Sequence, residues 1–268
     1  MTRVAAVQMV SSHELEANLA RAGQLLQEAA ASGAALAVLP ENFAFMGQKE
    51  TDKLAVAEPA GQGPIQEWLA RQARELGLWL VGGSIPLQDP DSPLPVSACL
   101  VFDAEGRQQA RYDKLHLFDV DLPGGESYRE SNTLTPGRAP VTVDTPFGRL
   151  GLAICYDLRF PELFRHYAEA GAEILTIPSA FTRTTGQAHW DVLVRARAIE
   201  NLAYVIAPNQ GGQHSNGRAT FGASQVVDPW GQVMGRLQSG SGVVLADLDP
   251  ALMQQHRSAL PALRHRRL

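Results

Sequence analysis

The chain has 268 residues, of which 45% are hydrophobic and 19% charged, a composition typical of a folded protein with an ample core. Its net charge of −5 gives no basic surface for nucleic acid or an anionic membrane, and no apolar run approaches the about 18 residues that a transmembrane helix needs. Two cysteines in a chain of this length argue against a disulfide framework and predict a cytoplasmic location.

The predicted elements alternate between strands and helices along much of the chain. Helices are predicted where leucines recur at helical spacing and glycine follows, at residues 13–32 and 65–77, and again from about residue 161 and over 188–201. Strands are predicted at the short apolar segments 3–9, 35–41, 78–84, 97–103, 108–114, 141–146, 150–154, 173–179 and 204–209. This order implies a largely parallel sheet covered by helices, with an antiparallel part in the middle of the chain.

The end of the chain is predicted to form a hairpin followed by a tail. Segments 223–231 and 242–249 are predicted to pair with each other as the closing hairpin. No internal repeat or Pro/Ser-rich linker divides the sequence, so we expect a single domain over residues 1–268 with a short basic tail from about residue 256.

Three predicted strands end on residues that can do chemistry, namely Glu41, Lys114 and Cys155. In open α/β sheets, reactive groups gather at the carboxyl ends of strands. A free thiol has a pKa of about 8.5, so a catalytic cysteine needs a base or a neighbouring cation. Glu41 is a candidate base, and Lys114 a candidate cation and oxyanion donor. Taken singly, each residue also has a structural interpretation: a core cysteine, a capping glutamate and a solvated lysine.

Three ordered motifs, "LPEN", "YDKLHLFD" and "AICYDLRFPEL", resemble the signature segments of the nitrilase (carbon–nitrogen hydrolase) superfamily. The segments "PSAFT", "TGQAHWDVLVRARAIEN" and "VVDPWG" are similar to the same family, and the resemblance covers nearly the whole chain. It implies an α/β fold in the form of a four-layer αββα sandwich with two mixed β-sheets. It also implies a homo-oligomer, a dimer or larger, and a reaction that needs no metal or organic cofactor.

The resemblance also implies roles for individual residues. Cys155 corresponds to the nucleophile, Glu41 to the general base and Lys114 to the oxyanion-stabilising lysine, while Glu130 corresponds to a second glutamate that positions the lysine and substrate. The backbone N–H of Tyr156 would be the second oxyanion donor. We expect the next charged residues, Asp157 and Arg159, to pair with each other and hold the nucleophile turn.

Within the superfamily, "YRESN" and "TGQAHW" resemble the Nit-type amidases. These imply hydrolysis of the distal amide of a 2-oxo diacid through a thioester, with deaminated glutathione as the expected small-molecule substrate. An ω-amidase acting on 2-oxoglutaramate or 2-oxosuccinamate is the alternative. Such substrates carry carboxylates, so we expect Arg183 to bind the oxoacid end, Phe181 to form a pocket wall and His189 to line the site.

Other classes of protein fit the sequence less well. A papain-like hydrolase would pair Cys155 with a histidine such as His189, but the chain lacks that local pattern. The seven histidines are scattered without zinc-ligand spacing, and no glycine-rich phosphate loop follows a strand. A non-catalytic binding module stays open, and it predicts that Cys155→Ala is harmless.

Overall fold

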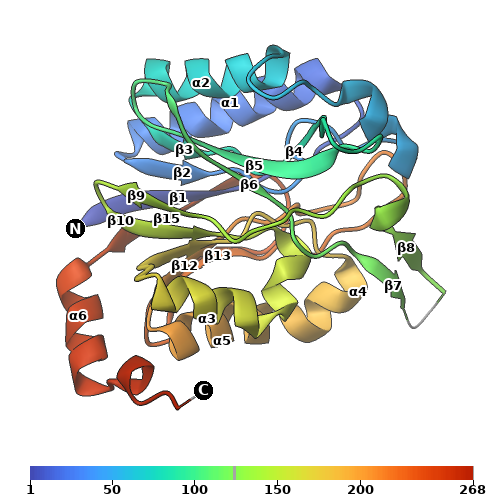
Figure 1. Ribbon diagram of the computed structural model, residues 1–268. Helices are drawn as coiled ribbons and strands as arrows, with labels where there is room; N and C mark the ends of the chain where they lie inside the picture. Colours follow the sequence, from blue (N-terminus) through green and yellow to red (C-terminus); the bar gives the residue numbers. More distant parts are fainter. Residues whose placement is uncertain (123–124, 268) are drawn as a thin grey trace.

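Two β-sheets lie face to face between two layers of helices in the computed structural model, which describes residues 1–122 and 125–267 (Figure 1). In spatial order, the first sheet contains β15 (Gly242–Leu248), β1 (Thr2–Gln8), β2 (Leu36–Val38), β3 (Trp79–Val81), β5 (Val96–Phe102) and β4 (Ile85–Leu87), with β6 (Gln108–Asp113) also paired to β5. The second contains β14 (Val233–Leu237), β13 (Ser224–Val227), β12 (Tyr204–Ala207), β11 (Ile174–Thr176), β10 (Gly148–Leu152) and β9 (Thr142–Thr145). Both sheets mix parallel and antiparallel pairs.

The outer faces of the two sheets are covered by separate helix pairs (Figure 1). Helices α1 (Leu15–Ala31) and α2 (Pro64–Leu76) cover the first sheet, and α3 (Pro161–Glu169) and α5 (Asp191–Asn201) cover the second. The predicted four-layer αββα sandwich with two mixed sheets is therefore confirmed.

Sequence signals for the ends of α1 and α2 agree with the structure. Proline at the start of α2 has no N–H to leave unsatisfied, and Gly77 ends the helix in the left-handed conformation, at φ 63°. Gly33, two residues beyond α1, has φ 83°. Both predicted helices lie within two residues of the observed bounds.

Alternating side chains of the central strands belong to two different cores. Along β1, Val4 and Ala6 pack between the two sheets, whereas Ala5 and Val7 pack against the helices α1 and α2. All four are fully buried, because this strand is covered on both faces. Continuous apolar strands such as "VAAV" are what a sheet covered on both faces requires.

The predicted closing hairpin is wrong. β13 pairs with β12 and β14, whereas β15 pairs with β1 in the other sheet. The true hairpin partner of β13 is β14, whose side chains are alternately half-buried and exposed, so its apolar signal is weak. Between them, the Asp228 side chain accepts hydrogen bonds from the backbone N–H groups of Trp230 and Gln232 and tightens the turn.

The remaining elements are short and lie outside the four layers. The strands β7 (Asp119–Asp121) and β8 (Ser127–Arg129) pair with each other, and they project at the right of Figure 1. Helix α6 (Pro250–Ala259) lies at the opposite side, so the tail expected from about residue 256 overlaps its last turn. No helix within the described ranges is long and apolar enough to cross a membrane.

Candidate active site

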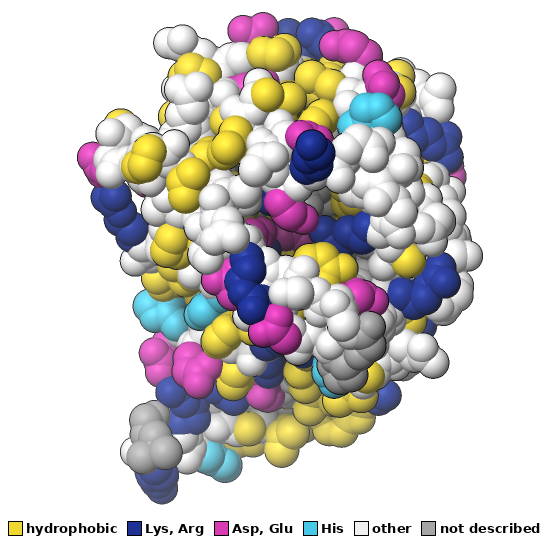
Figure 2. Space-filling view, turned by 90° about the vertical axis from the view of Figure 1, so that its right-hand side faces the viewer, with side chains coloured by type: hydrophobic (Ala, Val, Ile, Leu, Met, Phe, Trp, Pro, Cys, Tyr) yellow, Lys and Arg dark blue, Asp and Glu magenta, His cyan; other side chains and the backbone are white. Residues whose placement is uncertain are grey.

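The carboxyl ends of two sets of parallel strands meet at one edge of the molecule. β1, β2 and β3 run parallel in the first sheet, and β10, β11 and β12 run parallel in the second. A pocket of about 950 Å³, its open mouth included, lies at this edge. Figure 2, which faces this side, shows a hollow with acidic side chains in its depth and basic side chains around it.

Cys155 lies at the base of the pocket, in the turn that follows β10. Its φ of 48° is left-handed, a conformation that costs a residue other than glycine about 1–3 kcal/mol and is concentrated at functional sites. The Cys155 backbone N–H donates a hydrogen bond of 2.9 Å to the carbonyl of Pro178, beyond β11, so the neighbouring strand holds the turn. The residue is only 8% exposed.

Glu41 reaches the same place from the first sheet, three residues after β2. The next residue, Asn42, is also left-handed, at φ 56°, and its N–H donates to the Ser84 hydroxyl at 3.0 Å. From the second sheet, the Gln210 side-chain amide donates to the Glu41 carbonyl at 3.0 Å. Contacts from both sheets therefore fix the backbone that presents Glu41.

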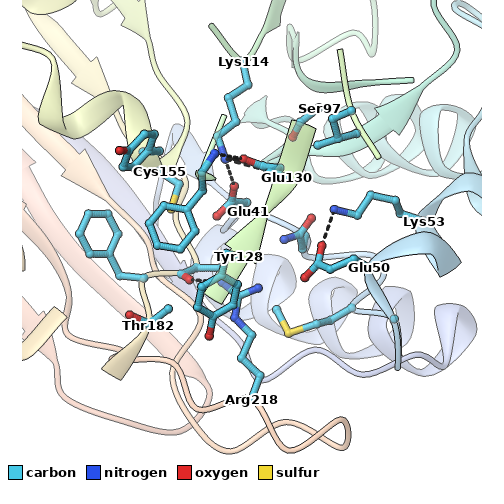
Figure 3. Close-up of a pocket in the computed structure, with 18 of the residues that line it drawn as sticks. Glu41, Glu50, Lys53, Ser97, Lys114, Tyr128, Glu130, Cys155, Thr182 and Arg218 are labelled. Carbon is cyan, nitrogen blue, oxygen red and sulfur yellow. Dashed lines mark hydrogen bonds and ion pairs between the residues drawn. The ribbon is translucent and has the colours of Figure 1, made fainter. Parts of the chain in front are cut away.

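Lys114 follows β6 and lies between two carboxylates (Figure 3). Its Nζ is 2.9 Å from Glu41 Oε1, and 2.8 and 3.0 Å from the two oxygens of Glu130. Glu130 is held in turn by the backbone N–H of Phe118 at 2.7 Å. The structure thus brings the four predicted catalytic residues, Glu41, Lys114, Glu130 and Cys155, to one pocket.

The electrostatics of this cluster favour a neutral thiol beside a charged lysine. Burial and the adjacent negative charge of Glu41 raise the pKa of the Cys155 thiol well above its usual value, against the opposing charge of Lys114. Burial alone would lower the pKa of Lys114, but Glu130 and Glu41 outweigh it and raise that pKa. The same lysine keeps the pKa of Glu130 below its usual range despite burial. The resting thiol therefore requires a base, and Glu41, which lines the same pocket and acts directly on the thiol, is the candidate.

Backbone donors complete the surroundings of the thiol. Tyr156 begins the turn after the cysteine, and its N–H makes no hydrogen bond to any of the residues described. The backbone N–H of Ala180, after β11, also faces the Cys155 sulfur. An oxygen that develops negative charge beside Cys155 can therefore receive hydrogen bonds from Lys114 and the Tyr156 N–H.

The expected pairing of Asp157 with Arg159 is wrong. Asp157 is fully buried and caps the nucleophile turn by accepting from the Ile154 N–H at 2.8 Å, while its other partners are Tyr112 and His116. Arg159 borders the pocket instead, and its guanidinium lies over the Phe181 ring at 5.2 Å. The carboxylate holds the turn, as expected, but its other partners come from the chain around Lys114 and not from Arg159.

Of the predicted substrate-binding residues, the structure brings only Phe181 into the pocket. Arg183 is exposed and outside it, because the chain turns into the short helix α4 (Arg183–Thr185), capped by Thr182. His189 is also exposed, and its Nδ1 lies 3.1 Å from Arg159 Nη1. Neither residue lines the pocket, so the expected arginine contact must come from elsewhere.

One pocket arginine missed in the sequence is Arg218, in the connection between β12 and β13. This connection leaves the carboxyl end of a parallel strand, and that position was the signal that could have identified it. Positive charge dominates the lining: six cationic residues face three carboxylates, although the whole chain has a net charge of −5. The cationic residues are Lys49, Lys53, Lys114, Arg129, Arg159 and Arg218.

The arrangement of the pocket provides for acyl transfer through a thiol. Within the described ranges, no group of three or more His, Cys, Asp or Glu side chains is arranged to hold a metal ion. The second cysteine, Cys99, is fully buried in the core between the sheets and takes no part in the pocket.

Comparisons with known proteins identify the class to which this fold and site correspond. The family model for carbon–nitrogen hydrolases matches residues 3–258. A protein of Mus musculus named deaminated glutathione amidase is 46% identical over 98% of this chain and 83% of its own length; one of the same name from Yersinia enterocolitica is 40% identical, over 98% and 92%. The crystal structure of Saccharomyces cerevisiae Nit3, described as a member of branch 10 of the nitrilase superfamily, superimposes with a TM-score of 0.90 at 33% identity, covering 100% of this chain and 97% of that one.

Fold, motifs and relatives agree on a hydrolase of carbon–nitrogen bonds. The chain belongs to the carbon–nitrogen hydrolase family. The resemblance that the three sequence motifs indicated is thereby confirmed.

Proposed function

We propose that the protein is an amidase that hydrolyses deaminated glutathione to 2-oxoglutarate and cysteinylglycine. The observation that carries the proposal is the excess of positive charge around a thiol, a lysine and two carboxylates. Deaminated glutathione has two carboxylates, one at each end, and a cationic pocket on an acidic protein concentrates such an anion. The name carried by relatives at 40% to 46% identity supports the same substrate.

In the first half of the reaction, Glu41 takes the proton of the Cys155 thiol and the thiolate attacks the amide carbon. Lys114 and the N–H of Tyr156 stabilise the tetrahedral oxyanion, and losing one such donor costs roughly 10²–10³ in kcat. Glu41 then gives its proton to the leaving nitrogen. The carbon–nitrogen bond breaks, cysteinylglycine departs, and the acyl group stays on Cys155 as a thioester.

In the second half, Glu41 takes a proton from a water molecule, whose oxygen attacks the thioester. The same oxyanion donors act again. The carbon–sulfur bond breaks, 2-oxoglutarate leaves, and the thiolate recovers its proton from Glu41. Glu130 holds Lys114 through both halves, at 2.8 and 3.0 Å, and so keeps the oxyanion donor in place.

The deciding experiment measures kcat/KM for deaminated glutathione beside 2-oxoglutaramate, with Cys155→Ala as the blank. We expect a clear preference for deaminated glutathione and no activity in the blank. A preference for 2-oxoglutaramate would make the enzyme an ω-amidase. Turnover of neither compound would overturn the proposed substrate class.

We also propose that the protein forms a homo-oligomer. Val192 and Ile199 lie seven residues apart on the same face of α5, and their exposed fractions are 69% and 44%. Trp230, 56% exposed, lies in the β13–β14 turn, which contacts α5 through a hydrogen bond from Arg195 to the Gly231 carbonyl. Light scattering on the wild type and on Ile199→Asp tests this, since the acidic side chain should lower the measured mass.

A further inference from the structure

The inference concerns which side chains bind the two ends of the substrate, and it rests on the proposed function. Two cationic residues of the pocket come from different segments. Arg218 comes from the β12–β13 connection, and Lys53 from the short 3-10 helix η1 (Glu50–Val56). Figure 3 shows Lys53 and Glu50 on one side of the pocket and Arg218 entering from another, beside Tyr128.

Arg218 is held in place and still has unused hydrogen-bonding capacity. Its Nη2 donates to the Ala180 carbonyl at 3.0 Å, and its guanidinium lies over the Tyr128 ring at 5.2 Å. Its Nε is buried and has no hydrogen-bond partner among the residues that the structure describes. A buried donor without a partner is unusual, and a carboxylate is the acceptor that best matches the planar guanidinium.

The loop that carries Arg218 is anchored on both sides. Asn216 donates to the Gly47 carbonyl at 2.7 Å and accepts from the Arg218 backbone N–H at 2.9 Å. The ring of His214 spans the Ser11 carbonyl and the Thr220 hydroxyl, each at 2.7 Å. The position of Arg218 is therefore set by the fold before any ligand arrives.

Arg218 lies close to the nucleophile through one shared residue. Ala180 directs its N–H at the Cys155 sulfur and its carbonyl at Arg218. The acyl half of deaminated glutathione is short, because four carbon–carbon bonds of about 1.5 Å separate its carboxylate from the scissile carbonyl. Because only Ala180 separates Arg218 from the thiol, the arginine is placed to reach the carboxylate of this short acyl group.

Lys53 provides the second cationic position. Its Nζ lies 2.9 Å from Glu50 in an i,i+3 pair, and the side chain is 20% exposed. An ammonium has three donors, and Glu50 uses one of them. The charge of Lys53 also acts on Glu130, so it faces the catalytic cluster from the rim. The leaving cysteinylglycine spans at most about 7 Å, so its carboxylate can lie at the pocket rim, where Lys53 is, while its amide lies at the catalytic cluster.

We propose that Arg218 binds the carboxylate of the 2-oxo acid end, and that Lys53 binds the glycine carboxylate of the leaving dipeptide. The enzyme then distinguishes deaminated glutathione from 2-oxoglutaramate through Lys53, because only the larger substrate carries the second carboxylate. Arg218 serves both substrates equally.

The test compares three substrates in each variant. These are deaminated glutathione, its analogue with an uncharged glycinamide end, and 2-oxoglutaramate. We expect Lys53→Met to lower kcat/KM for deaminated glutathione by about 10- to 100-fold, the range for losing a hydrogen bond to a charged group, and to leave the other two substrates unchanged. We expect Arg218→Gln to lower kcat/KM for all three by a similar factor, mainly through KM, and Arg218→Lys to recover part of it.

The matched control is Arg129→Gln. Its guanidinium already binds both oxygens of Asp121, at 2.8 and 2.7 Å, so this variant removes one positive charge at the pocket rim without removing a free donor. It should leave the ranking of the three substrates unchanged. Thermal unfolding of each variant checks that the loops remain folded.

Two results would overturn the inference while leaving the proposed function intact. One is an equal loss on all three substrates in Lys53→Met, and the other is unchanged hydrolysis of 2-oxoglutaramate in Arg218→Gln. If the wild type hydrolyses neither natural substrate, the proposed function fails first and the inference fails with it.

Discussion

The carboxylate of Asp157 accepts a hydrogen bond of 2.7 Å from the hydroxyl of Tyr112. Tyr112 lies two residues before Lys114, and Asp157 two residues after Cys155. The other Asp157 oxygen is 2.7 Å from the ring of His116, which lies two residues after the lysine. One buried carboxylate therefore joins the two segments that carry the lysine and the thiol.

Asp157→Asn should damage both stability and turnover. An amide has one accepting oxygen, so its NH2 group would face buried donors, and a buried unsatisfied group costs about 1–3 kcal/mol. Because the turn carrying Cys155 would shift relative to Lys114, kcat should fall by about 10- to 100-fold. Urea unfolding and steady-state kinetics measure the two effects.

The control for this variant is Asp144→Asn on the protein surface. Asp144 pairs with Arg149, and its side chain is 77% exposed, so its loss should change neither measurement appreciably. If Asp157→Asn behaves like the surface variant, the carboxylate does not position the site.

The two cysteines should differ sharply toward iodoacetamide. Cys99 is fully buried and burial raises the pKa of its thiol, so it should react only after unfolding. Cys155 opens on the pocket but its thiol pKa is also raised, so its alkylation should accelerate as the pH rises above neutrality. Peptide mass spectrometry assigns the modified residue, and labelling of Cys99 in the folded protein would contradict the prediction.

Glu41→Gln should separate thiol reactivity from catalysis. The negative charge of Glu41 is one cause of the raised Cys155 pKa, so its removal should lower that pKa and speed alkylation at a given pH. Turnover should nevertheless be abolished, because no base remains to pass protons to the leaving nitrogen and from water. Slower alkylation together with retained turnover would contradict the proposed role of Glu41 as the general base.

Glu130→Gln should reveal its contribution through the pH dependence of stability. The folded protein holds the pKa of Glu130 below its usual 4.5, against burial, through Lys114 and Lys53. A lowered pKa stabilises the folded state at pH values above 4.5, and this stability is lost as the pH falls through the folded-state value. The wild type should therefore exceed the variant in unfolding free energy at pH 7, and the difference should shrink in acid.

Activity of the same variant tests the positioning of the lysine. With Glu130 neutral, Lys114 keeps only one carboxylate partner, so kcat should fall by about 10- to 100-fold with little change in KM. Glu126→Gln, an exposed carboxylate four residues earlier, is the matched control. A change in KM without a change in kcat would indicate that Glu130 contacts the substrate and does not position Lys114.

The strand-end argument depends on local pattern, and the structure brings its three residues to one pocket. Glu41, Lys114 and Cys155 each follow an apolar strand, and parallel strands bring such positions to one edge. The periodicity of the sequence did not indicate that these three residues would meet from two different sheets. It depends on long-range contacts such as the Gln210 side chain reaching the Glu41 carbonyl, 169 residues away in sequence, and only family resemblance indicated the second sheet.

Errors arose where partners lie far apart in sequence. β15 pairs with β1 at the other end of the chain, although we expected its segment to form a local hairpin with 223–231. Arg183 was favoured because it follows "PSAFT", but Thr182 starts a helix there and leaves the arginine exposed. For Arg218, the only signal was that its connection follows the carboxyl end of a strand, and its exact place in the pocket comes from loop contacts to Gly47 and Ala180.

His214 should make the Arg218 loop sensitive to acid. Burial lowers the pKa of this histidine below its usual 6.5, and the positive charge of Arg218 acts in the same direction. A lowered histidine pKa means that stability is fully present above pH 6.5 and is lost as the pH falls toward the folded-state value, because the unfolded chain binds the proton first. His214→Asn cannot titrate, and its amide can still donate to the Ser11 carbonyl. At pH 8 the wild type should be more stable than the variant, because the variant loses the contact between the His214 ring and the Thr220 hydroxyl. Between pH 6.5 and 5 this difference in unfolding free energy should narrow, and urea unfolding at each pH measures it. A difference that stays constant would show that folding does not change the pKa of His214.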